Sequence, residues 1–272
     1  MSAPCAQRDL LRCLIAGIAF VLSVVSGLAE EPVAGADRLD FMKKSVAEYL
    51  VKSPAGDLKL VPEPLLRWDN PVSKVPDGTV FLWNDRQGRP AAIVGVYSSA
   101  RDWWMHEFQS LTTDTLEATR GSTPVWAPIA AGIEWKILAE APVPAESKTA
   151  RLAQMRQLAR RFEVEDRFEG KGEWELRLLT TPLYRYGEEP TEVLDGAIFA
   201  FAHGTDPELF VMFEARPGTT ERGDDRTWMY ALAPMSSYAM DVKDQGRLVL
   251  SLEQRKGPQD PRKPFFRVRY LP

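Results

Sequence analysis

Apolar runs separated by polar breaks predict three consecutive antiparallel strands in residues 79–112. Residues 80–83 form the first run, residues 93–97 the second and residues 103–111 the third. Turn residues at 86–89 follow the first run, and a second polar break, at residues 99–102, follows the second run. The segment holds three of the eight tryptophans and one of the two histidines, so it is where we expect a site.

The third of these strands divides its side chains between two faces. With a period of two residues, one face carries Trp104, His106 and Phe108, and the other carries Met105, Glu107 and Gln109. The pattern therefore separates the imidazole of His106 from the carboxylate of Glu107.

Two segments have helical spacing. Residues 37–51 begin with Asp37, a typical N-cap, and form the first helix, and residues 147–162 form a longer amphipathic helix. Between them we expect a proline-rich extended segment at 57–78 and strands within 79–138, with 113–132 mostly loop. We interpret the basic side of the second helix as a solvated face, made of Lys148, Arg151, Arg156, Arg160 and Arg161.

Residues 173–271 are a succession of short strands and turns. The predicted fold class is α+β and mainly antiparallel β, either a meander or hairpin sandwich or a barrel-like sheet. The N-terminal helix and the longer amphipathic helix would pack against it. No repeat of fixed period appears, which excludes a solenoid or a propeller.

The first 29 residues have the pattern of a secretory signal peptide. Arg8 and Arg12 precede an uncharged apolar stretch at 14–25, and small residues end the segment at Ala29. The alternative is an uncleaved anchor, but the apolar stretch is shorter than the ~20 residues of a membrane span. We therefore expect a single mature domain of residues 30–272, exported to the periplasm or the outside of the cell.

Both cysteines, Cys5 and Cys13, lie in that segment. The mature chain would contain no disulfide, no thiolate metal site and no cysteine nucleophile. Cleavage would change the net charge from −4 to −5, which argues against nucleic acid or an anionic membrane surface as the main partner. No later stretch is apolar enough for a transmembrane segment.

Catalytic chemistry has few candidates in this sequence. His106, Glu107 and Asp102 are the acid–base candidates for hydrolysis of an extracellular polymer such as a glycan. No G-x-S-x-G elbow occurs, so no serine stands out as a nucleophile. No glycine-rich phosphate loop occurs either, and we expect no cofactor. A zinc site would need both His106 and His203, and we expect no metal.

The tryptophans are numerous and dispersed, which favours a core role for most of them. The adjacent pair Trp103 and Trp104 differs, because alternation sends one ring to each face. Our main hypothesis is a non-catalytic envelope or extracellular binding protein, which would contact a glycan or an envelope protein through an aromatic-lined face at Trp103, Trp104 and His106. The alternatives are the hydrolase and a purely structural interaction protein.

Several stretches are distinctive in combination: 64–71, 78–83, 106–111, 125–128, 155–162, 174–179 with 182–186, and 194–201 with 204–208. Together they resemble a family of exported planctomycete proteins that has no assigned activity, and the resemblance covers about residues 60–240. It implies one domain, export and a bacterial envelope setting. It implies no catalytic residue.

Overall fold

The computed structural model describes residues 35–98, 103–167, 172–187, 192–218, 226–257 and 259–270. The expected signal peptide at 1–29 and Asp102 lie outside these residues. Among the residues described, no helix is long and apolar enough to cross a membrane.

The first half of the described chain begins with a helix and continues with short and long strands. Its elements are α1 (Gly35–Ala47), β1 (Tyr49–Ser53), β2 (Gly56–Asp57), β3 (Lys59–Leu60), β4 (Leu66–Asn70), β5 (Val75–Asn84), β6 (Pro90–Ser98), β7 (Trp104–Ser110), β8 (Glu117–Arg120), β9 (Thr123–Trp126) and β10 (Lys136–Ile137).

The second half again begins with a helix. Its elements are α2 (Lys148–Ala159), β11 (Phe162–Asp166), β12 (Trp174–Glu175), β13 (Arg177–Tyr186), β14 (Asp195–His203), β15 (Asp206–Arg216), β16 (Thr227–Pro234), β17 (Met240–Asp244), β18 (Arg247–Leu252) and β19 (Phe265–Tyr270).

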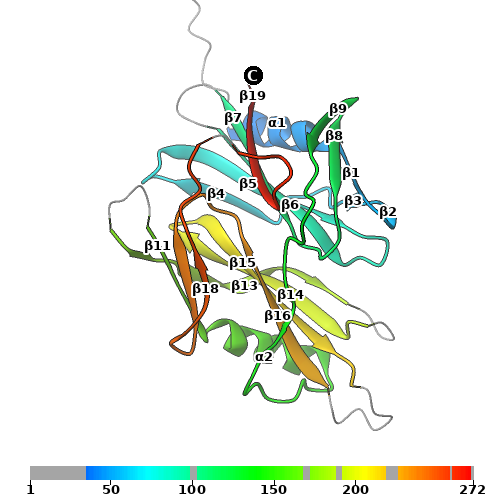
Figure 1. The fold of residues 1–272 in the computed structure, drawn as a ribbon, viewed down its shortest axis with the longest axis vertical. Coiled ribbons are helices and arrows are strands. Elements are labelled where there is room, and N and C mark those ends of the chain that lie inside the picture. The colour runs from blue at the N-terminus through cyan, green and yellow to red at the C-terminus, as the bar shows by residue number, and fades with distance from the viewer. Residues whose placement is uncertain are drawn as a thin grey trace, which may run out of the picture. The chain divides into compact units, whose positions relative to one another are not determined.

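The described strands form four antiparallel sheets (Figure 1). Sheet A has the order β2-β1-β8-β9, and sheet B has the order β19-β7-β6-β5-β3, with β4 also paired to β5. Sheet C has the order β10-β16-β15-β14-β13, and sheet D has the order β12-β11-β17-β18. The fold class is thus α+β and mainly antiparallel β, as predicted, and the predicted meander is β5-β6-β7.

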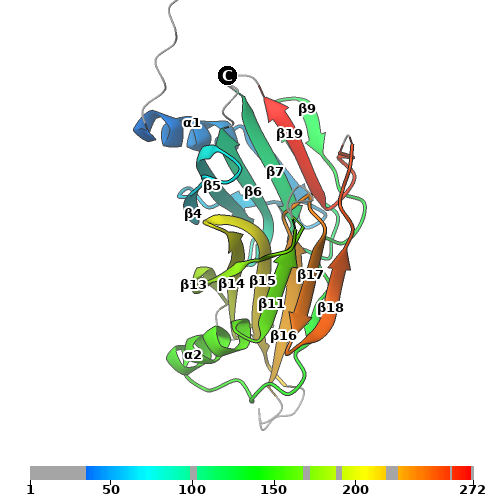
Figure 2. The same ribbon diagram turned by 90° about the vertical axis from the view of Figure 1, so that its left-hand side faces the viewer.

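Both faces of sheet B and both faces of sheet C are buried. On β5, Val80 and Leu82 belong to the core shared with sheet C, while Phe81 and Trp83 pack with α1 and sheet A. Sheet C likewise has α2 and sheet D on its other face. Figure 2 shows α1 against the sheet of β5 and β6, and α2 against the sheet of β14 and β15. Burial on both sides explains why these strands are apolar almost without interruption.

The element order of the first half occurs again in the second. In each half a helix leads into a strand, β1 or β11. A meander follows, β4 to β7 or β13 to β16, and a last hairpin, β8-β9 or β17-β18, returns to pair with that first strand. The pairing registers agree as well: the register shift after Ala118 in one hairpin occurs after Val242 in the other. The described chain is therefore a tandem repeat.

Side chains at equivalent positions make equivalent contacts. Arg38 of α1 and Arg67 of β4 both bind the carboxylate of Asp77, with nitrogen–oxygen distances of 3.1 and 2.7 Å. Asp77 precedes Gly78, over which the ring of Trp68 lies. The corresponding contacts of the second half are made by Arg151, Arg185, Asp195, Gly196 and Tyr186.

The two halves exchange their last strands. β10 follows the β8-β9 hairpin but adds to the edge of β16 in sheet C. β19 follows the β17-β18 hairpin but adds to the edge of β7 in sheet B, where six residue pairs form. The segments that lead to them also meet, because the amide of Ala127 donates to the carbonyl of Pro261 at 2.9 Å. Each half thus completes the sheet of the other.

Four details differ from the sequence-based expectations. The first helix ends at Ala47 instead of residue 51, because the chain there becomes strand β1 with Tyr49 and Val51 in the core. The second helix is shorter too, since Phe162 begins β11. Residues 113–132 contain β8 and β9. The segment 57–78 is extended as expected, but part of it forms β4 at the edge of sheet B.

The basic side of α2 is not simply a solvated face. Arg151 is 1% exposed, and its guanidinium binds the carboxylate of Asp195. Arg161 binds Asp244 through two nitrogens at 2.8 and 2.9 Å. Two of the five basic side chains therefore fasten α2 and its end to the sheets.

Candidate functional site

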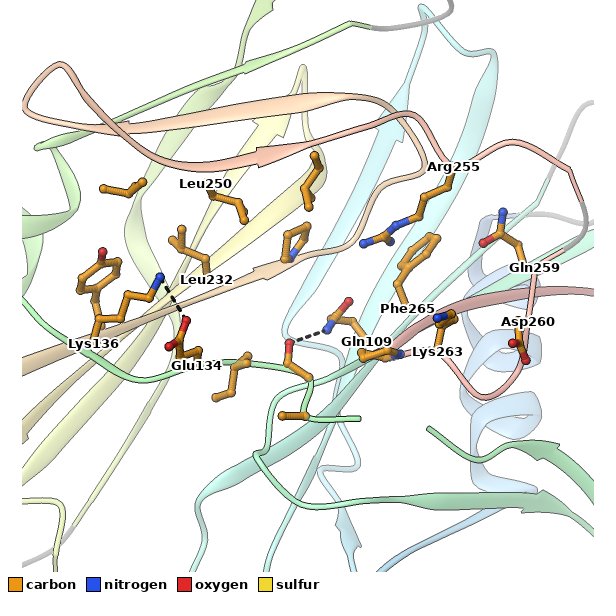
Figure 3. A pocket seen from close by; sticks show the side chains of 18 of the residues that line it. Gln109, Glu134, Lys136, Leu232, Leu250, Arg255, Gln259, Asp260, Lys263 and Phe265 are labelled. Carbon is orange, nitrogen blue, oxygen red and sulfur yellow. Dashed lines mark hydrogen bonds and ion pairs between the residues drawn. The ribbon is translucent and has the colours of Figure 1, made fainter. Parts of the chain in front are cut away.

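A pocket of about 600 Å³ opens beside the place where the exchanged strands meet. Its walls come from β16, β18 and β19, from the segment before β10 and from the loop before β19. In Figure 3, Leu232 and Leu250 lie between Lys136 with Glu134 on one side and Arg255 with Phe265 on the other. The pocket has the size at which protein sites take small ligands.

The internal repeat explains why the pocket exists in the second half. The β17-β18 register makes Leu250 the equivalent of Trp126, and the β15-β16 register makes Leu232 the equivalent of Phe108. In the first half these two rings stack with their centroids 5.3 Å apart, and both are buried. Two leucines therefore stand where two large rings close the core of the other half.

The exchanged strand adds a third difference. In sheet B, Phe266 of β19 pairs with Phe108 and belongs to the core. If the pairing of β10 with β16 is continued by two residues, Glu134 lies opposite Leu232. In sheet B the equivalent position, opposite Phe108, is occupied by Phe266 of β19. Glu134 binds Lys136 at 3.1 Å. A carboxylate thus replaces a third ring, and the space stays open.

One end of the pocket is rich in cations. Arg255 and Lys263 lie there (Figure 3), Lys256 also lines the pocket, and in the described part of the chain none of the three is ion-paired with a carboxylate. The guanidinium of Arg255 donates to the carbonyl of Ser236 at 3.1 Å and lies 4.5 Å over the ring of Phe265. Burial lowers the pKa of Arg255, and the charge of Glu107 opposes that effect.

The acidic side chains that line the pocket already have partners. Glu134 is paired with Lys136, and Asp260 is held by the exposed Arg262 through two nitrogens at 3.1 Å. The pocket therefore carries a surplus of positive charge at the end where Arg255 lies.

His106, the first catalytic candidate, is enclosed. It is 0% exposed, and its ring nitrogens lie 2.8 Å from the Tyr49 hydroxyl and 3.3 Å from that of Ser45. Burial, and then the charge of Arg120, lower the pKa of His106 to about 3. The ring is thus a neutral member of the core that joins β7 to β1 and α1.

Glu107 lies on the opposite face of β7, as the alternation predicted. Its carboxylate accepts a hydrogen bond from Tyr97 at 2.9 Å and lies 3.8 Å from Arg267. Burial raises its pKa, although Arg267 and Tyr97 oppose that shift. The structure does not bring Glu107 and His106 together, and the third candidate, Asp102, is outside the described residues.

The tryptophan pair divides between two environments. Trp104 is 7% exposed and stacks on Phe41 with centroids 4.4 Å apart. Trp103 is half-buried, with the guanidinium of Arg269 at 4.3 Å from its ring centre. Neither ring lines the pocket. The tryptophans mainly stabilise the fold here, since Trp83, Trp126 and Trp228 are also buried.

The second histidine belongs to another part of the fold. His203 is 6% exposed, lies 4.0 Å from Asp166 and packs against Trp174. Burial lowers its pKa. Within the described ranges, no group of three histidine, cysteine or acidic side chains is arranged to hold a metal ion.

Comparison with known proteins gives no relative. No protein-family model matches the chain, and no curated protein and no solved structure is significantly similar to it. The function must therefore be argued from the site itself.

Proposed function

We propose that this chain is an exported, non-catalytic binding protein that takes a small, largely apolar ligand in the pocket between β16, β18 and β19. The carrying observation is the replacement of Trp126 and Phe108 by Leu250 and Leu232 at equivalent positions, which leaves about 600 Å³ open. Export is supported by the signal pattern of residues 1–29 and by the resemblance to exported planctomycete proteins.

The lining favours binding over catalysis. Catalysis of hydrolysis needs titratable groups that converge on a cavity. The two pocket carboxylates, Glu134 and Asp260, are engaged in ion pairs, and His106 lies away from the pocket in the core. The apolar lining residues instead offer contact to a ligand chain or ring. They are Ile133, Leu232, Val249, Leu250, Leu252 and Phe265.

The test uses a neutral apolar fluorophore, N-phenyl-1-naphthylamine, titrated into residues 30–272. We expect saturable binding to the unmodified chain. The double variant Leu232→Phe/Leu250→Trp puts the rings of the first half into the second, so it should still fold and weaken binding by about tenfold or more, equivalent to about 1.4 kcal/mol.

Leu248→Trp is the matched control. Leu248 is an exposed residue of the same strand and does not line the pocket, so its replacement adds an indole without filling the site. This variant should bind like the unmodified chain. Equal binding by the double variant, with circular dichroism showing that it is folded, would refute the proposal.

A further inference from the structure

Among the described residues, no carboxylate forms an ion pair with Arg255, Lys256 or Lys263, and the charge of Glu107 acts on Arg255 only from a greater distance. Arg255 is half-buried, and its polar partner is a backbone carbonyl instead of a carboxylate. Two other arginines of the described chain do bind buried carboxylates: Arg151 binds Asp195, and Arg89 binds Glu214 through two nitrogens at 2.8 Å. A partly buried guanidinium without an ion-paired carboxylate is unfavourable, and an anionic group of a ligand would supply the missing ion pair.

Charge and apolar surface occupy different parts of the pocket. Leu232 and Leu250 lie in the middle, and Arg255 and Lys263 lie toward one side of them (Figure 3). Lys256 adds a third positive charge to the lining. A ligand that matches this division has an apolar chain joined to a single anionic head.

We propose that the pocket binds a single-chain amphiphile with an anionic head, with the chain against Leu232 and Leu250 and the head at Arg255 and Lys263. This inference rests on the proposed function and names its ligand class. Burial of each chain methylene would favour binding, and the guanidinium of Arg255 would donate charge-assisted hydrogen bonds to the head.

The experiment compares three ligands with the same twelve-carbon chain at pH 8. Dodecanoate, dodecanol and dodecyltrimethylammonium, all kept below the concentration at which they aggregate, compete with N-phenyl-1-naphthylamine for the chain of residues 30–272. We expect dodecanoate to bind at least about tenfold more tightly than dodecanol, and the cation to bind most weakly. Added salt should weaken dodecanoate more than dodecanol.

Two variants locate the head group. Arg255→Gln and Lys263→Gln should each weaken dodecanoate by several-fold and leave dodecanol unchanged, because only the head loses a partner. Arg269→Gln is the control, since Arg269 is exposed on β19, carries the same charge and does not line the pocket. It should bind all three ligands as the unmodified chain does.

The outcomes separate the two proposals. If the neutral probe binds in the pocket but dodecanoate and dodecanol compete equally, the anionic preference is wrong and the binding function stands. If no probe or ligand binds, both fail. Cosedimentation with phosphatidylglycerol vesicles without binding of monomeric dodecanoate would also overturn the inference, in favour of adsorption to a lipid surface. Binding of the monomer, lost in Arg255→Gln, supports it.

Discussion

Acidic side chains gather where sheets B and C meet. Glu107 of β7 interacts electrostatically with Asp206 and Glu208 of β15. Asn70 donates to Asp206 at 3.1 Å, and Ser236 is hydrogen-bonded to Glu208. Burial raises the pKa values of all three carboxyl groups, and their mutual repulsion adds to the shifts of Asp206 and Glu208. Each of these groups therefore releases its proton at a higher pH in the folded protein than a free carboxyl group does.

The pH dependence of stability follows from that shift. A carboxyl group whose pKa is higher in the folded state binds its proton more tightly there, so its contribution is complete below the unfolded value of 4.5. The contribution is lost as the pH rises toward and through the raised pKa. We expect Glu208→Gln to make the unfolding free energy less dependent on pH above 5, by up to about 1.4 kcal/mol per pH unit.

Urea unfolding between pH 5 and pH 8 measures this effect. Asp206, Glu107 and Asp166 are the other acidic groups that act on Glu208, and they remain in the variant. Glu117→Gln, at an exposed position of β8, should leave the slope of the unmodified chain in place. A Glu208→Gln protein with that same slope would show that Glu208 is ionised in the folded state.

At the scale of elements, each helix is tied to its sheet through one aspartate. The carboxylate of Asp195 forms ion pairs with Arg151 of α2 and Arg185 of β13. The carboxylate of Asp77 forms the equivalent pairs with Arg38 of α1 and Arg67 of β4. The two sites differ in burial. The side chain of Arg151 is 1% exposed, against 26% for that of Arg38.

This difference predicts unequal effects of the same substitution. Asp195→Asn leaves a buried guanidinium without its counter-ion and should lower the unfolding free energy by about 3 to 5 kcal/mol. Asp77→Asn should lower it by less, about 1 to 3 kcal/mol, because water reaches both of its arginines. Urea denaturation at pH 7 measures both, and equal losses would contradict the assignment of Arg151 as the buried partner.

Patterns among neighbouring residues were enough to predict the central strands of the first half and the two helices. Apolar runs between polar breaks predicted β5 and β6, alternation described β7, and helical spacing predicted α1 and α2, because each pattern depends on neighbouring residues. The alternation also separated His106 from Glu107 correctly. The strands β8 and β9 were missed because each has four residues and β9 contains Pro124.

The repeat and the pocket were harder to predict because they depend on distant residues. Arg67 and Asp77 are ten residues apart, as are Arg185 and Asp195, and each aspartate precedes a glycine. That coincidence was the available signal, but a search for short periods does not detect it. The pocket depends on Leu232, Leu250 and Phe265, which meet only after strand exchange.

At the scale of the whole described chain, the exchange of β10 and β19 makes the halves interdependent. Without β19, sheet B would lose the strand that pairs with β7. Phe266 of β19 is also part of the core beside α1. Sheets B and C also share a core, and Arg89 of the first half binds the buried Glu214 of the second. Neither half carries a complete set of contacts alone.

A cleavable linker tests this interdependence. Val143 lies between β10 and α2 and is 55% exposed, so a protease site inserted before it should be cut without unfolding. We expect the two fragments of the cleaved chain to elute together in gel filtration at the volume of the intact protein. They should separate only in denaturant, because each contributes a strand to the other's sheet. A cut chain that yields two separate folded halves under native conditions would mean that the shared core and exchanged strands are too weak to join them.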